Sequence, residues 1–546
     1  MASIATIPLA ALLLCGCYDL DVSTPQTGTD TDTDTDTDSD TGPAFDGDLE
    51  WVVQAGGGNS NNVGISVDAF SDGDLLVTGF HGDGAVFGPG EANETALYAS
   101  PCHDMPIARY DRDGALEQAR RIGAEPEEGT SFNHNEGYYL EILNDGSFVI
   151  VGNAQGTTPV IFGEGEANET ALTPVTSWGK DLYAARFNDD GTLAWARMAG
   201  GNMADTAVSG FVPPDGDTLW IVGAFSTDAT FGAGEANETV LSTDAFCFDG
   251  ASGTTFFLAA YDLANGDLRW AKQALGCSTG MSISGAADSG YLLVTGRFEE
   301  TMTLGEGADA VTLASAGGAS PGGDDAFVAR FDAEDGALAW AVSAGGGGLD
   351  RGTSIAELAG GSALVAGTFE GGATFTSASG GSETILEATG GEGFFTAVYT
   401  SDGGLASART NGVGGEGAWS TDGGYPVLLA LPGGDYMVGG QFVGSVVLGP
   451  GEPAEIGFES RGVTDLYLAR FDPDGALRWA RQEGGEVDDW FGNLVAPTEG
   501  TVVATGMFGG TVTFGTGEEN ETTLTAIGTT ETVTGLDMFL MKVAIE

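Results

Sequence analysis

Short runs of alternating apolar and polar residues recur along the chain after residue 45, and glycine-containing turns separate them. In residues 327–341 and 466–480, two such runs flank an Asp-Gly step. A period of two is typical of a strand with one buried face, and Asp-Gly supplies the positive φ angles of a tight hairpin turn. The pattern predicts many short antiparallel strands and an all-β protein.

One strand motif occurs seven times, so the strands belong to a repeat. The motif is an apolar pair, a small residue, glycine, any residue and an aromatic residue, with departures in single copies. Successive copies are 66 to 73 residues apart, and each unit of about 72 residues also carries a second hairpin. Four strands in each repeat are typical of a propeller blade. The motif glycines are Gly79, Gly152, Gly223, Gly296, Gly367, Gly440 and Gly506.

The last unit stops at residues 539–543, without the turn and the outer strand of its second hairpin. The missing piece stands at the other end of the repeat region, where residues 46–51 match residues 474–479 in spacing. If residues 46–55 supply this outer strand, the array closes into a ring and leaves no edge strand unpaired. The sequence therefore predicts a seven-bladed β-propeller over residues 46–546, closed by an N-terminal strand clasp.

The repeat also resembles a known family. Each unit combines Gly-Gly, a strand, Asp-Gly, a segment such as LLVTGxF, and Asp-x-Phe-x-Ala-Arg-Phe-Asp-x-Asp-Gly-x-Leu-x-Trp-Ala, with local variation. This combination resembles the bacterial β-propeller repeat family called SBBP, over about residues 46–546. The resemblance implies a propeller in an exported surface protein, and it carries no single activity.

The N-terminus reads as an export signal followed by a spacer. An apolar run from Ile4 to Leu14 is too short to span a bilayer, and it ends in Leu14-Cys15-Gly16-Cys17. This resembles a lipoprotein signal peptide of residues 1–16 with lipidation at Cys17, and plain secretion is the alternative. Residues 17–45 contain a Thr/Asp run, which predicts a disordered stalk. We expect an exported protein, held on the outer membrane or cell surface by its lipid and otherwise secreted.

The charge of the chain limits its partners. The formal net charge is −62, from 80 acidic and 18 basic residues. Such a field repels phosphate backbones and anionic lipid surfaces, so nucleic acid is excluded as a partner and any membrane contact is made through the lipid anchor alone. We expect the propeller to be a monomer.

The unusual residues of the repeats map to one side of the predicted ring, which we call the loop face. An added segment between the second and third strands reads FGPGEANETAL at residues 87–97, with counterparts in other units. It predicts either an added hairpin with a polar tip or an oxygen-rich Ca²⁺ site formed by Glu91, Asn93, Glu94 and their counterparts.

A second repeated feature is an aspartate at the entry of the third strand. Five carboxylates in equivalent positions predict either backbone capping at the strand entry or a partial ring on the loop face that binds a cation or ligand. These residues are Asp104, Asp181, Asp325, Asp465 and Asp537.

The histidines suggest a metal site in the first unit. His81, His103 and His134 are the three histidines of the chain, all map to the loop face, and Cys102 adjoins His103. Three imidazoles and a thiolate suit Zn²⁺ or Cu²⁺, and a chance cluster of exposed side chains is the alternative.

Two further cysteines, Cys247 and Cys277, also fall on the loop face of one unit. In an exported protein they are either a disulfide or two free thiols.

The tryptophans fall into two groups. Those that share one position in the fourth strand predict packing between neighbouring blades, and they are Trp51, Trp195, Trp270, Trp340 and Trp479. Trp419 and Trp490 lie in predicted connections, where we expect them to be ligand candidates.

No catalytic residue is predicted, because the chain has no H-E-x-x-H, G-x-S-x-G or phosphate-loop motif. We expect a non-catalytic surface lipoprotein whose propeller is a binding or scaffold module for a glycan or for an envelope or extracellular protein. Two alternatives stay open. One is an extracellular polysaccharide hydrolase or lyase that uses loop-face carboxylates, and the other is a structural envelope protein.

Overall fold

The computed structural model describes residues 47–58, 61–99, 102–124, 133–213, 216–243, 254–285, 290–317, 323–381, 383–415, 417–419, 425–527 and 535–545. The predicted signal peptide (1–16), Cys17 and the stalk (17–45) lie outside these residues. The described part is all-β, and its one helix is the short 3-10 turn Gly307–Asp309. No helix in the described ranges is long and apolar enough to cross a membrane.

Each repeat of the sequence folds into an antiparallel meander of four strands, which we call a unit. The first three units are β2 (Val63–Ala69), β3 (Leu75–Phe80), β6 (Met105–Tyr110) and β7 (Leu116–Ala124); β8 (His134–Ile142), β9 (Phe148–Gln155), β12 (Asp181–Phe187) and β13 (Leu193–Gly201); and β14 (Asp205–Phe211), β15 (Thr218–Ser226), β18 (Thr254–Asp262) and β19 (Leu268–Gln273).

The later units repeat this order. They are β20 (Ser278–Gly285), β21 (Tyr291–Phe298), β24 (Asp325–Asp332) and β25 (Leu338–Gly346); β26 (Arg351–Leu358), β27 (Ser362–Thr376), β28 (Glu383–Tyr399) and β29 (Leu405–Gly414); β30 (Val427–Ala430), β31 (Tyr436–Phe442), β34 (Asp465–Phe471) and β35 (Leu477–Glu483); and β36 (Trp490–Val495), β37 (Thr501–Gly509), β40 (Leu536–Ala544) and β1 (Leu49–Gly56).

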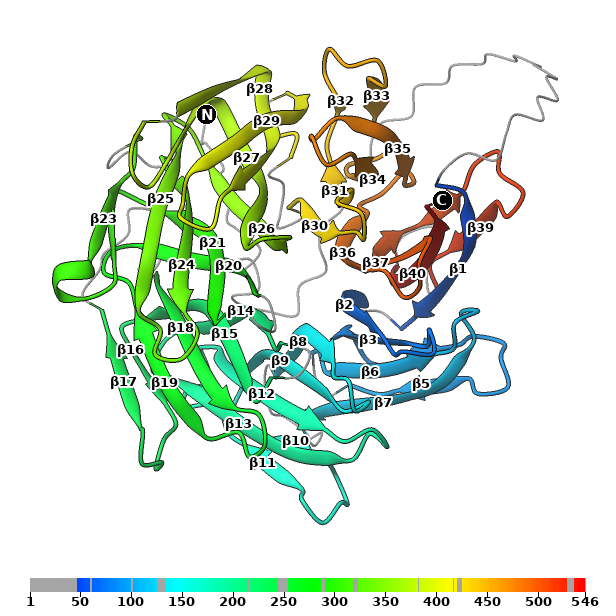
Figure 1. Cartoon of the computed structure of the whole chain (residues 1–546). Coiled ribbons are helices and arrows are strands. Elements are labelled where there is room, and N and C mark those ends of the chain that lie inside the picture. The colour runs from blue at the N-terminus through cyan, green and yellow to red at the C-terminus, as the bar shows by residue number, and fades with distance from the viewer. Residues whose placement is uncertain are drawn as a thin grey trace, which may run out of the picture.

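The units stand side by side in a ring (Figure 1). The first strand of each unit contacts the first strands of both neighbours, so that β2 touches β36 on one side and β8 on the other. A ring of four-stranded meanders with their first strands innermost is the arrangement of a β-propeller.

The ring is closed by the N-terminal strand, as the sequence predicts. β1 pairs antiparallel with β40, from Trp51 opposite Lys542 to Ala55 opposite Met538. Figure 1 shows β1 beside β40, close to the marked C-terminus. Because β1 is the outer strand of the last unit, the first and last repeats are held together by ladder hydrogen bonds.

The added segments form hairpins, which confirms the first of the two readings of the sequence. Most of these hairpins pair with the fourth strand of the preceding unit, as β4 does with β1 and β10 with β7. The hairpins are β4 (Ala85–Phe87) with β5 (Thr95–Leu97), β10 (Val160–Phe162) with β11 (Thr170–Leu172), β16 (Asp228–Phe231) with β17 (Thr239–Ser242), β22 (Thr301–Leu304) with β23 (Val311–Ala314), β32 (Ser445–Leu448) with β33 (Ile456–Glu459), and β38 (Thr511–Phe514) with β39 (Thr522–Thr525).

The polar tips of these hairpins bind backbone within the fold, and Ca²⁺ binding at the tips stays a prediction. Glu91 Oε2 accepts a hydrogen bond from the Leu116 amide at 2.7 Å, and Asn93 donates to the Leu116 carbonyl. Glu94 accepts from the Gly90 amide. The same three bonds recur around Leu193 and Leu268. The tip oxygens thus fix the start of a fourth strand.

The fourth-strand tryptophans pack between units, as predicted. A Cβ on the turn glycine of the next unit would strike the indole ring, which shows that each ring lies flat against that turn. Three of the rings also donate their indole N–H to a backbone carbonyl of the unit that follows, as Trp195 does to the Leu263 carbonyl. The glycine and tryptophan pairs are Gly114 with Trp51, Gly266 with Trp195, Gly336 with Trp270, Gly403 with Trp340, and Gly47 with Trp479.

Candidate functional site

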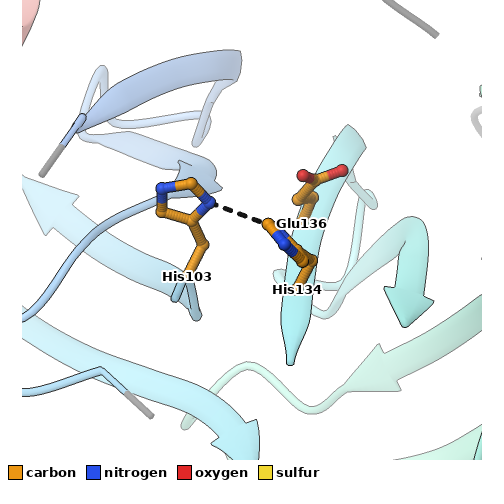
Figure 2. Close-up of side chains that lie close together, drawn as sticks. All are labelled: His103, His134 and Glu136. Carbon is orange, nitrogen blue, oxygen red and sulfur yellow. Dashed lines mark hydrogen bonds between the residues drawn. The ribbon is translucent and has the colours of Figure 1, made fainter. Parts of the chain in front are cut away.

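A buried polar cluster lies where the first unit meets the second. His103 belongs to the connection before β6, and His134 opens β8. The two residues form a parallel bridge, in which the His103 amide donates to the Asn133 carbonyl and the Asn135 amide donates to the His103 carbonyl. Figure 2 shows the His103 ring directed toward the His134 ring, with Glu136 on the same strand as His134. Residues two apart on a strand point to the same face, so the strand itself brings His134 and Glu136 together.

The distances within this cluster are short. His103 Nδ1 lies 3.3 Å from His134 Nδ1. One ligand atom from each of His103, His134 and Glu136 lies within 4.8 Å of the other two. Glu136 is fully buried, and its Oε2 accepts hydrogen bonds from Lys180 Nζ at 2.7 Å and from the Tyr138 hydroxyl at 3.0 Å. Lys180 is itself only 2% exposed, so this is an ion pair inside the protein.

The surroundings set the charge of these side chains. Burial, helped by the neighbouring His134, lowers the pKa of His103 to about 4. Burial also lowers the pKa of His134. Burial alone would raise the pKa of Glu136, but the positive charge of Lys180 outweighs it and leaves that pKa below its usual value. At neutral pH the cluster therefore holds two neutral imidazoles and a carboxylate, the protonation states that bind metals.

This donor set differs from the one expected from the sequence. His81 lies apart from the three ligand atoms: its ring is buried, and its Nδ1 is 2.8 Å from the Gly82 carbonyl oxygen. Cys102 is disulfide-bonded, and a disulfide sulfur is not the thiolate ligand that we expected. His103 and His134 stay in the candidate site, and Glu136 joins them.

The five strand-entry aspartates lie inside the fold and not in an exposed cation ring. All five are buried, and four cap backbone amides near the strand entry, as Asp537 does for Ile527 and Gly57. Asp104 instead pairs with Arg121 at 2.9 Å and accepts from the Asn135 amide group. A glycine at or next to the end of the fourth strand lies beside each carboxylate, where a Cβ would overlap it, as at Gly200 beside Asp181. This is the backbone-capping alternative.

The two tryptophans expected to be ligand candidates are buried. Trp419 has no exposed surface and packs edge-on against Phe394 and Tyr467. Trp490 is 9% exposed because it opens the innermost strand β36. The exposed tryptophan of the described residues is Trp178, at 71%, in the connection between β11 and β12.

A disulfide between Cys247 and Cys277, one of the two alternatives, stays a prediction. Cys277 is disulfide-bonded. Cys247 lies outside the described residues.

Comparison with known proteins gives no relative for this chain. No family model matches it, so membership of the SBBP family stays a prediction. No curated protein matches it either.

Solved structures with a similar course of the chain include Chaetomium thermophilum Sqt1 (10% identity, 84% of this chain and 96% of that chain, TM-score 0.38). A second is the quinohemoprotein alcohol dehydrogenase of Comamonas testosteroni (12% identity, 92% of this chain and 76% of that chain, TM-score 0.39). A third is the Dos1 propeller (8% identity, 91% of this chain and 96% of that chain, TM-score 0.33). Likeness at these scores carries no functional argument, so function has to be argued from the residues.

Proposed function

We propose that this protein is an exported binding module, a seven-bladed β-propeller of the SBBP type that is anchored through a lipid on Cys17. The Thr/Asp stalk holds the propeller away from the membrane. Ligand binding is centred on Trp178, and the observation that carries this proposal is the exposure of that side chain at a fixed position on the loop face.

Trp178 is held out into solvent by an ordered connection. The Val175 amide donates to Asp181 Oδ2, and the Gly179 amide donates to Thr176 Oγ1 at 3.1 Å. Gln155 Nε2, from β9, donates to the carbonyl of Trp178 itself at 3.2 Å. A tryptophan on an ordered backbone leaves only its side chain to be fixed on binding, and tryptophan is among the residues that dominate binding energy.

Two further apolar side chains lie on the same connections. Val175 is 58% exposed, and Met203, in the following connection, is 39% exposed. The backbones of these connections touch, since a Cβ on Gly179 would strike the carbonyl of Met203. We call Val175, Trp178 and Met203 the Trp178 patch. An indole with apolar neighbours suits a sugar ring or an apolar protein contact, and the net charge of −62 disfavours an anionic ligand.

The alternative of a polysaccharide hydrolase or lyase gains no specific support from the five strand-entry aspartates. Such an enzyme needs two carboxyl groups about 5 to 10 Å apart at the substrate. The strand-entry aspartates are buried and bound to neighbouring groups of the protein. We therefore favour binding without catalysis.

A binding screen tests this proposal. Residues 46–546 would be applied to arrays of neutral glycans and to purified envelope proteins, beside the variants Trp178→Ala and Ile385→Ala. Ile385 is a matched control because it is 61% exposed on the added hairpin of another unit, outside the Trp178 patch. We expect Trp178→Ala to weaken binding at least tenfold and Ile385→Ala to leave it unchanged. A ligand bound equally by all three proteins would contradict the role of Trp178.

A further inference from the structure

We propose that His103, His134 and Glu136 bind one divalent transition-metal ion, of the class of Zn²⁺, which joins the first unit of the ring to the second. This site goes beyond the proposed binding of ligands at the Trp178 patch, and neither depends on the other.

The first argument is the spacing of the two imidazoles. Zinc binds imidazole nitrogen at about 2.0 to 2.1 Å in a tetrahedral arrangement, which places two such nitrogens about 3.3 Å apart. The Nδ1 atoms of His103 and His134 are 3.3 Å apart. The structure therefore holds both rings at the separation of one edge of a zinc tetrahedron, and a bound ion would replace the hydrogen bond between them.

The second argument is that Glu136 keeps one oxygen free for an ion. Its Oε2 is occupied by Lys180 and Tyr138. Its Oε1 is buried and has no hydrogen-bond partner among the described residues. A buried carboxylate oxygen without a partner is costly, so this atom is a ready ligand. Two histidines and one glutamate are a donor set that proteins use for zinc.

The third argument is that backbone pairing holds the site in place. The amide and carbonyl groups of His103 both bond to the strand that carries His134 and Glu136. The ring of Phe80 packs on His103 with centroids 4.7 Å apart. The ligands thus come from two units but are fixed before an ion arrives, and such preorganisation favours binding.

Lys180 sets the strength of this site. Its ammonium group neutralises Glu136 in the absence of an ion and repels a divalent cation that binds beside it. Replacing Lys180 by methionine removes this repulsion and keeps most of the side-chain volume. The substitution should therefore tighten metal binding, which a site remote from Glu136 would not show.

Competitive titration with a chromophoric zinc chelator tests the proposal on residues 46–546. Excess Ca²⁺ would be present throughout to occupy surface carboxylates. We expect one Zn²⁺ per chain, a loss of at least a hundredfold in the His103→Ala, His134→Ala double variant, and a loss of about tenfold in Glu136→Gln. Lys180→Met should bind at least tenfold more tightly. His81→Asn is the matched control, since its histidine is buried nearby but lies outside the site, and it should bind like the wild type.

Several results would overturn the site. They are no zinc bound by the wild type, equal binding by the double variant, weakened binding in His81→Asn, or unchanged affinity in Lys180→Met. Because a buried variant can fail to fold, the cobalt-loaded wild type gives an independent measurement. A tetrahedral Co²⁺ spectrum in the visible range supports the site, and an octahedral spectrum contradicts it.

Discussion

Replacing Asp205 by asparagine should raise the stability of the ring at alkaline pH and flatten its dependence on pH. Asp205 opens β14, has no exposed surface, and accepts a hydrogen bond from the Ser226 amide at 3.1 Å. Burial, together with the nearby charge of Asp181, raises the pKa of Asp205 to about 8. Burial raises the pKa of Asp181 to about 6. Two buried acids therefore share one seam between units.

The sign of the effect follows from the direction of this shift. Because the folded protein holds the proton of Asp205 more tightly than the unfolded chain, its stability is greatest below the unfolded pKa, near 3.8. Stability then falls as the pH rises towards about 8, by up to about 1.4 kcal/mol per pH unit. Between the unfolded and the folded pKa of Asp205, the total loss of unfolding free energy is at most about 6 kcal/mol.

The preceding unit already carries an asparagine, Asn135, at the position equivalent to Asp205. The backbone amide of Asp205 donates to the Lys180 carbonyl, and the backbone amide of Asn135 donates to the His103 carbonyl in the same way. The side chain of Asn135 also donates to Asp104 Oδ1 at 2.8 Å. The Asp205→Asn variant can make the corresponding bond to Asp181 and still accept from Ser226. A repulsion between two acids would become a hydrogen bond.

Urea unfolding between pH 5 and pH 8.5 measures this effect. We expect the wild type to lose stability as the pH rises, and the variant to lose less, by about 1 kcal/mol per pH unit. Asp228→Asn is the control, because Asp228 is exposed at the start of β16, and its curve should keep the slope of the wild type. Parallel curves for the wild type and Asp205→Asn would refute the reasoning.

Four other substitutions test the packing of the ring. Leu49→Ala in β1 and Leu193→Ala in β13 remove equivalent buried side chains, and each should lower the free energy of unfolding by about 2 to 5 kcal/mol. Only Leu49→Ala should also speed hydrogen exchange in β40. Equal exchange rates of β40 in the two variants would count against the clasp. Glu166→Gln keeps the shape of the hairpin tip but weakens the charged hydrogen bond to the Leu193 amide, so thermal unfolding should show a stability lower by about 1 kcal/mol. An unchanged melting temperature would contradict a structural role of the hairpin tip. Trp419→Ala should cost about 3 to 5 kcal/mol in chemical unfolding, whereas a surface side chain would cost almost nothing.

The repeat made most of the fold predictable. Seven copies of one pattern fix the strands, the turns and the missing outer strand, because local periodicity and chain closure both leave a trace in the sequence. The recurring glycine at the end of the fourth strand, as at Gly200, was a further trace: it leaves room for a buried carboxylate, and it could have shown that the aspartates face inward.

The candidate site was only half predictable, because it depends on contacts between residues distant in the chain. His134 and Glu136 are two residues apart and share a face because β8 begins at His134, whereas the sequence only mapped His134 to the loop face. Lys180 lies 44 residues beyond Glu136, and nothing local to either residue reveals their ion pair. The prediction that Trp419 is a ligand candidate was wrong for a related reason. Trp419 lies in the connection after the fourth strand, but the chain folds it back against Phe394.

Disulfide trapping tests the closure of the ring by β1 most directly. Val53 in β1 lies opposite Leu540 in β40. Val503 is on β37, on the far side of β40 and out of reach of a disulfide. In the folded protein, oxidation should join the two ends of the chain in the Val53→Cys, Leu540→Cys variant, and leave the Val53→Cys, Val503→Cys variant open on a non-reducing gel. Two free thiols in the first variant after oxidation would contradict the closed ring.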